Sequence, residues 1–205
     1  MDTDEVYGTF SILAISPDLK HMGVAVASGS TFVGDRVPHA RPSVGMIATQ
    51  AYTNVSYGFE GLALLAKGLA PLAVLDALLK EDAQKNLRQV AIMNFKKEKA
   101  VFTGANVPEW CSEVIADDYI VVGNLLSSKK VAISIARQFE NSSGDLAWRL
   151  AEALTAGSKS GGDKRGEKSA ALIVVDSEKV KVEIKVDAHE NPIETLFSKL
   201  QRVVE

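Results

Sequence analysis

Apolar residues fall into short β-type runs that come in pairs, and stretches with helical spacing lie between the pairs. The runs at 8–16 and 22–29 flank a turn-forming segment around Pro17 and Asp18, which predicts a β-hairpin at the start of the chain. Further strands are expected at 44–49, 88–95, 100–104, 119–122, 169–175 and 180–186. We expect a loop at 34–42, and the segment 105–118 has no readable period.

Helical periods fill the gaps between these strands. One begins near Gly61, and a second begins at Pro71, a residue that suits the first turn of a helix. Further helices are expected at 129–140, at 145–156 with Gly157 as the C-cap, and at 192–203. Paired strands alternating with paired helices do not suit a Rossmann fold. The order predicts an α+β fold, a four-layer αββα sandwich with two antiparallel sheets between helix layers.

Composition narrows the class of protein. A chain of 205 residues that is 46% hydrophobic and 24% charged can bury the core of one domain, which we place at 9–205 after a leader at 1–8. A net charge of −3 gives no reason to expect a nucleic-acid or membrane partner. The single cysteine, Cys111, and the absence of a signal-peptide pattern predict a cytoplasmic protein. Three histidines without ligand spacing predict no metal, and nothing indicates a cofactor.

The most distinctive candidate for chemistry is Thr9, which follows Gly8 at the start of the first strand. At a free N-terminus, its hydroxyl would be the nucleophile and its α-amine, with a reference pKa of about 8, the base. Inside the chain the amine is an amide, so activation requires cleavage between Gly8 and Thr9. Gly8 has no side chain and leaves its carbonyl open to the Thr9 hydroxyl in an N-to-O acyl shift. The alternative is that Thr9 is an ordinary β-branched strand residue.

Other polar residues stand where they could assist. We expect Ser28 to lie beside Thr9 and bond its hydroxyl or amine, or else to begin a turn. Gln50, Asn54 and Asn124 offer amide donors for a carbonyl or an oxyanion, although amides at strand ends also serve as turns and caps. Arg41 could hold a substrate carboxylate or lie in a solvated loop.

The glycine-rich segment 161–169 superficially looks like a phosphate-binding loop. Glu167 separates Gly166 from Lys168, and the loop lies between a helix and a strand in the reverse of the order that such loops need, so we expect no nucleotide hydrolysis. Its glycines allow close backbone approach, and Asp163 and Arg165 could form a structural pair or orient Thr9. The alternative is a plain flexible loop.

Several blocks together resemble one known family. In order they are GTFSILAIS, GVAVASGSTFVG, VGMIATQAYTN, YGFEGLALLAKG, RQVAIMN, TGANV, GNLL and AGSKSGGDKRGEKSAALIVV. Over residues 9–187 the chain resembles the DUF1028 family, which is placed among the N-terminal nucleophile (Ntn) hydrolase-like folds. Members often begin Met-Thr-Phe-Ser, whereas eight residues precede Thr9 here.

The resemblance implies an Ntn amidohydrolase or peptidase-like protein that cleaves an amide bond in a small molecule or peptide through Thr9, after 1–8 are removed. The expected catalytic residues are Thr9, Ser28, Asn124, Asp163 and Ser169, and the expected substrate-binding residues are Arg41, Gln50, Asn54 and Arg165. The competing hypothesis is a non-catalytic binding or structural protein that keeps the fold. Leucine-rich helix pairs also predict a homo-oligomer, a dimer or higher.

Overall fold

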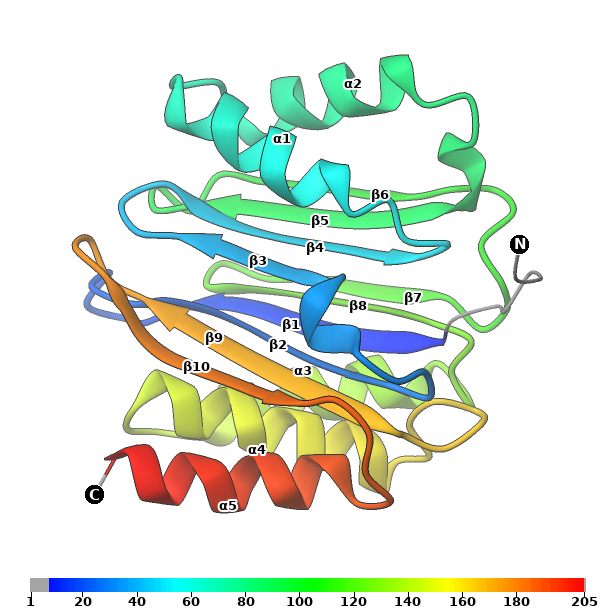
Figure 1. The fold of residues 1–205 in the computed structure, drawn as a ribbon, viewed down its shortest axis with the longest axis vertical. Coiled ribbons are helices and arrows are strands. Elements are labelled where there is room, and N and C mark those ends of the chain that lie inside the picture. The colour runs from blue at the N-terminus through cyan, green and yellow to red at the C-terminus, as the bar shows by residue number, and fades with distance from the viewer. Residues whose placement is uncertain (1–7, 205) are drawn as a thin grey trace.

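The computed structural model describes residues 8–204, so the predicted leader before Gly8 lies outside the described residues. Two antiparallel sheets lie face to face (Figure 1). The six-stranded sheet has the order β10-β9-β2-β1-β8-β7, and the four-stranded sheet has the order β3-β4-β5-β6. The strands of the first sheet are β1 (Thr9–Ile15), β2 (Met22–Ser28), β7 (Ser112–Ile115), β8 (Tyr119–Asn124), β9 (Ser169–Val175) and β10 (Val180–Val186). Those of the second are β3 (Pro38–Arg41), β4 (Gly45–Ala51), β5 (Arg88–Asn94) and β6 (Lys99–Thr103).

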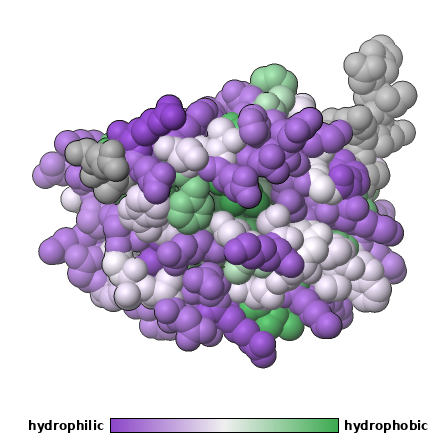
Figure 2. All heavy atoms as spheres, turned by 90° about the horizontal axis from the view of Figure 1, so that it is seen from below, coloured by the Kyte–Doolittle hydropathy of each residue, from purple (hydrophilic) through white to green (hydrophobic). Residues whose placement is uncertain are grey.

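Helices cover the outer faces of both sheets, as Figure 1 shows. The four-stranded sheet carries α1 (Ser56–Ala66) and α2 (Pro71–Glu81), and the six-stranded sheet carries α3 (Lys130–Asn141), α4 (Leu146–Lys159) and α5 (Pro192–Val204). The predicted α+β, four-layer αββα arrangement is confirmed. Seen from the side of α3 to α5, polar side chains dominate the surface and apolar ones form separate spots (Figure 2).

Three apolar clusters correspond to the three interfaces between the layers. In β1, Phe10 and Ile12 face α3 and α4, whereas Leu13 and Ile15 face the second sheet. All seven residues of β1 are buried, because both faces of the strand are covered. This double burial explains why the first hairpin is a nearly continuous apolar run rather than an alternating one.

The structure corrects the prediction in four places. Helix α1 begins at Ser56 rather than near Gly61. The segment expected to be a loop contains a 3-10 turn at Val33–Asp35 and the edge strand β3, whose Pro38 and short length hid it. The unreadable segment contains β7, another edge strand. Gly157 is not a C-cap, since α4 continues to Lys159. A Cβ at Gly157 would lie 2.7 Å from Ile135 Cγ1, so glycine here lets α3 and α4 pack closely.

Candidate functional site

Four polar side chains form a row across the inner face of the six-stranded sheet. Thr9 is paired with Ser28 on β2 and with Asn124 on β8, and Ser28 is paired with Ser169 on β9. Opposite residues of antiparallel strands share a face. The row therefore faces the four-stranded sheet, as Leu13 does farther along β1. All four side chains of the row are buried.

A second polar row faces the first from the other sheet. Gln50 on β4 is paired with Gln89 on β5, which is paired with Thr103 on β6. The Gln50 Nε2 donates to Gln89 Oε1 at 2.8 Å and, at 3.4 Å, to the main-chain carbonyl of Thr9. The Ser11 hydroxyl donates to Gln50 Oε1 at 2.6 Å. Gln50 thus fixes the two sheets to each other at Thr9.

The sequence analysis missed Gln89 and Thr103. Gln89 donates through Nε2 to Thr103 Oγ1 at 3.0 Å and to the Gly123 carbonyl at 3.1 Å. The sequence did contain a sign of this role, because Gln89 precedes the apolar run of β5 in a buried position. A buried amide side chain needs hydrogen-bond partners, so such a residue indicates a polar contact inside the protein.

The hydroxyl of Thr9 is linked to the carbonyl that precedes it through one side chain. Thr9 Oγ1 donates to Ser28 Oγ at 3.1 Å, and Ser28 Oγ donates to the Gly8 carbonyl oxygen at 2.6 Å. The backbone N–H of Ser30 also donates to Ser28 Oγ, at 3.1 Å. A proton leaving Thr9 therefore has an acceptor whose own proton already points at the Gly8 carbonyl.

The ion pair of Arg165 and Asp163 also contacts the Gly8 carbonyl. Arg165 Nη2 donates to the Gly8 oxygen at 3.3 Å and to Asp163 Oδ2 at 2.9 Å, and Arg165 Nε donates to Asp163 Oδ1 at 3.1 Å. Asp163 is buried and also accepts from the Gly29 N–H at 2.7 Å. The bidentate geometry and the backbone donor hold the Asp163 side chain in one orientation beside Gly8.

The carboxylate of Asp163 also explains why glycine precedes Thr9. A Cβ at Gly8 would lie 2.5 Å from Asp163 Oδ2, and a Cβ at Gly29 would lie 2.8 Å from the same oxygen. Both contacts are too short for a real side chain, so any larger residue at position 8 would displace the carboxylate or the Gly8–Thr9 peptide.

The loop that carries Asp163 is anchored at several points. Asp163 forms a β-bridge with Leu126, and the Lys164 N–H donates to the Leu125 carbonyl at 3.0 Å. Glu167 accepts from the Asp163 N–H at 2.9 Å and from the Ser158 hydroxyl at 2.8 Å. The loop is held between the end of α4 and the segment after β8, which fixes the Asp163 and Arg165 pair beside Gly8.

Asn124 lies opposite Thr9 on the neighbouring strand, and one of its two side-chain polar atoms has no hydrogen-bond partner among the described residues. Its Nδ2 donates to Gln89 Oε1 at 3.1 Å, so the donor expected for an oxyanion already has a partner. Its Oδ1 is buried and has no hydrogen-bond partner in the described part of the chain. A buried acceptor without a donor is costly, so this oxygen is placed to accept a hydrogen bond from a group outside residues 8–204.

Ser169 lies in the row but serves the backbone. Its hydroxyl donates to the Ser30 carbonyl at 2.5 Å and accepts from the Val33 N–H at 3.2 Å. These bonds hold the segment after β2, which carries the N–H donors at Gly29 and Ser30. Ser169 therefore acts on the site through the segment that it positions.

Two of the expected substrate-binding residues lie elsewhere. Asn54 Oδ1 accepts from the Ser56 N–H at 3.2 Å, so this side chain caps the start of α1. Arg41 is exposed and is paired with Gly45, at the opposite end of β4 from Gln50. The structure therefore does not bring Arg41 to Thr9.

A charged cluster at the start of β5 supports the glutamine row. Arg88 Nε donates to Asp82 Oδ2 at 2.8 Å, and the Tyr57 hydroxyl donates to the same oxygen at 2.8 Å. The hydrogen bond from Arg88 lowers the pKa of Asp82 to about 2, whereas burial raises the pKa of Tyr57. This cluster ties α1 and α2 to the residue that precedes Gln89.

Within residues 8–204 no group of histidine, cysteine, aspartate or glutamate side chains could hold a metal ion. The helices of this part of the chain are also too short or too polar to cross a membrane.

Comparison with solved structures finds protein SPO2555 from Silicibacter pomeroyi, which is 31% identical, with a TM-score of 0.90 over 97% of this chain and 87% of that chain. Anbu (ancestral beta-subunit) from Yersinia bercovieri is 10% identical, with a TM-score of 0.46 over 96% of this chain and 94% of that chain. Anbu from Hyphomicrobium sp. strain MC1 is 9% identical, with a TM-score of 0.48 over 95% of this chain and 94% of that chain.

No curated protein matches the chain. The model of a family of unknown function, DUF1028, matches residues 9–196, and the structure of SPO2555 carries the same family model. The match covers most of the chain and includes Thr9 together with the row across the sheet and the Asp163 loop. The chain belongs to the DUF1028 family.

Proposed function

We propose that the protein cleaves its own Gly8–Thr9 peptide bond and then uses Thr9 as an N-terminal nucleophile to hydrolyse an amide bond in a small molecule or peptide. The observation that carries this proposal is the hydrogen-bonded path from Thr9 Oγ1 through Ser28 Oγ to the Gly8 carbonyl oxygen. The four-layer arrangement is also that of the N-terminal nucleophile hydrolases, although fold alone does not specify function.

The first step is an N-to-O acyl shift. Thr9 Oγ1 attacks the Gly8 carbonyl carbon, its proton passes to Ser28 Oγ, and the Ser28 proton passes to the Gly8 oxygen. Arg165 Nη2, which also contacts that oxygen, stabilises the negative charge that develops there. The carbon–nitrogen bond then breaks as the nitrogen takes the proton, which leaves Gly8 as an ester on Thr9. Water hydrolyses the ester and releases a free Thr9 amine and hydroxyl.

The same donors suit the second reaction once the Gly8 carbonyl has left. Ser28 Oγ and Arg165 Nη2, which both donate to the Gly8 oxygen, lie where they could donate to the carbonyl oxygen of a substrate in the same position. The new α-amine takes the hydroxyl proton of Thr9 and delivers it to the leaving amine. We infer that Asn124 Oδ1, which has no donor within residues 8–204, accepts a hydrogen bond from this amine.

Intact mass and N-terminal sequencing of three proteins test the proposal. We expect the wild type to lose residues 1–8 and begin at Thr9, Thr9→Ala to stay uncut, and Thr9→Ser to be cut because serine keeps the hydroxyl. Thr31→Ala, which changes an exposed threonine, is the matched control and should be cut like the wild type. The cut protein is then assayed against a panel of acyl anilides.

Retention of residues 1–8 by folded wild-type protein after long incubation would contradict self-cleavage and favour the non-catalytic binding protein. Cleavage of wild type and Thr9→Ala at equal rates would indicate an external protease instead. Cleavage that depends on Thr9 without turnover of any anilide would support processing alone and direct the search to other amides.

A further inference from the structure

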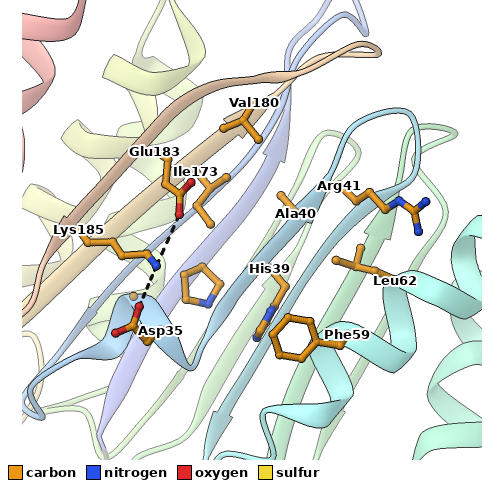
Figure 3. A pocket seen from close by; sticks show the side chains of 12 residues that line it. Asp35, His39, Ala40, Arg41, Phe59, Leu62, Ile173, Val180, Glu183 and Lys185 are labelled. Carbon is orange, nitrogen blue, oxygen red and sulfur yellow. Dashed lines mark hydrogen bonds and ion pairs between the residues drawn. The ribbon is translucent and has the colours of Figure 1, made fainter.

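A groove of about 540 Å3 runs beside β3, away from Thr9 (Figure 3). It arises because the two sheets differ in width. β3 is the edge of the four-stranded sheet, whereas the six-stranded sheet continues to β10. The inner face of β9 and β10 therefore extends past β3 on one side, and α1 lines the groove on the other. The volume is within the range of natural binding sites, about 300–1,000 Å3.

The floor of the groove is the free edge of β3. The Thr49 N–H donates to the Val37 carbonyl, and hydrogen-bonded pairs alternate along an antiparallel ladder. Because Val37 forms a hydrogen-bonded pair with Thr49, the next such pair along β3 is His39 with Ile47. The backbone groups of Pro38 and Ala40 therefore point away from β4. Pro38 agrees with this assignment, because proline in a sheet occupies edge positions where no N–H is needed. The edge thus presents the Ala40 N–H and C=O and the Pro38 C=O.

The two walls of the groove face each other. Phe59 and Leu62 of α1 form an apolar wall, and Ile173 and Val180 are the apolar side chains of the other wall, which also carries Glu183 and Lys185 (Figure 3). Phe59 is 66% exposed and Val180 is 44% exposed, so each wall offers an apolar side chain to a ligand. A strand placed beside β3 would direct its side chains alternately to the two walls, since successive residues of a strand point to opposite faces.

The ends of the groove differ. At one end the Asp35 carboxylate accepts from Lys185 Nζ at 2.8 Å, and this ion pair joins the 3-10 turn before β3 to β10 (Figure 3). At the other end lies the exposed guanidinium of Arg41. A second copy of this chain has its own β3 recessed between the same two walls, so two such edges do not reach each other. A single extended segment fits this space.

We propose that this groove binds an extended peptide segment of a partner protein, which adds a fifth strand to the four-stranded sheet along β3. Backbone hydrogen bonds to Ala40 and Pro38 supply affinity, and apolar side chains at alternate positions supply specificity through the two walls. The site is independent of Thr9 and of self-cleavage.

The test uses a fluorescein-labelled library of hexapeptides that alternate apolar and polar residues, with anisotropy as the readout. We expect binding that weakens at least about tenfold when the middle backbone amides of the selected peptide are N-methylated. Phe59→Ser in the apolar wall should also weaken binding about tenfold, whereas Leu72→Ser, the matched change of an exposed apolar residue on α2, should leave it unchanged. Hydrogen exchange of the Ala40 amide should slow when the peptide is added.

Ala40→Pro removes the outward N–H and should abolish binding; circular dichroism shows whether this variant folds. If Ala40→Pro does not fold, the comparison between the unmodified and the N-methylated peptide still tests the proposal, because it uses the wild-type protein. The proposal would be overturned if no peptide mixture bound at about 1 mM. Equal binding of the N-methylated peptide would also overturn it and would indicate a small apolar ligand. Protection of the Ala40 amide that depended on protein concentration alone would indicate a second copy of this chain instead.

Discussion

The polar end of the sandwich around Thr9 and the groove beside β3 differ in how their polar groups are satisfied. Around Thr9, hydroxyl, amide and carboxylate groups bond to one another, and the side chains of the row are buried. Along the groove, the outward backbone groups of β3 lie between two walls in which Phe59 and Val180 are exposed. This difference is the basis for our two proposals, that the first region acts on the chain itself and that the second binds a segment of another protein.

The difference also concerns charge. Asp163 is fully enclosed and is held by both Arg165 and a backbone N–H, whereas the side chain of Asp35 is 56% exposed beside Lys185. Only the Asp163 side of its pair is enclosed, because the Arg165 side chain is 33% exposed, and a carboxylate left there without a partner would have no solvent to replace it. An exposed pair contributes little, because water replaces the lost partner. Changes near Thr9 should therefore have much larger effects than changes along the groove.

The largest effect is expected at Ser28. Ser28→Ala removes the donor to the Gly8 carbonyl and the acceptor for the Thr9 proton, so self-cleavage should slow by about 10²–10³-fold. A time course of intact mass measures this rate. Ser30→Ala is the control, because it removes only a 3.5 Å contact from Arg165 and leaves the backbone donor in place. Equal slowing in both variants would contradict the proposed proton path.

A second large effect is expected at Asp163. Asp163→Ala leaves the Gly29 N–H without its acceptor and removes the carboxylate partner of Arg165, whose side chain is 33% exposed and still contacts the Gly8 carbonyl. The free energy of unfolding should therefore fall by about 2 kcal/mol. Urea denaturation of the Thr9→Ala background, in which the chain stays uncut, measures the change. A loss below about 1 kcal/mol would show that the pair is screened like a surface pair.

A smaller, pH-dependent effect is expected at His39 in the groove. Burial lowers the pKa of His39, the hydrogen bond to the Arg36 carbonyl raises it, and the charge of Lys185 lowers it, with a net pKa below 6.5. The unfolded chain then binds a proton at higher pH than the folded chain, so stability should fall as the pH drops through 6.5 towards the folded pKa. Denaturation between about pH 7.5 and pH 5.5 should show a steeper fall in wild type than in His39→Gln. Equal slopes would assign the fall to other groups.

The smallest effect is expected at Asp35. Asp35→Ala breaks the exposed pair with Lys185 and should change the free energy of unfolding by less than about 1 kcal/mol. The same urea titration that is used for Asp163→Ala measures it. A loss comparable to that of Asp163→Ala would mean that the 3-10 turn before β3 depends on this pair, and that the end of the groove is rigid.

Much of the fold followed from local patterns. The hairpins of β1 with β2 and of β9 with β10, the start of α2 at Pro71 and the four layers were predicted from apolar runs and turn residues. The missed strands β3 and β7 are short edge strands, which have only one neighbour and little apolar pattern of their own. Helix α4 was predicted too short, because Gly157 is required by packing against α3 rather than by a helix end.

By itself, the sequence determined the layered α+β architecture and pointed to the glycine and threonine pair at the start of the first strand, because both depend on residues near one another in the chain. Only the tertiary structure decided which distant side chains meet there. Strand register placed Ser28 and Asn124 against Thr9, and the face-to-face packing of the sheets brought Gln89 to them. The same packing left Arg41 at the far end, because position along a strand fixes which end of the sandwich a side chain can reach.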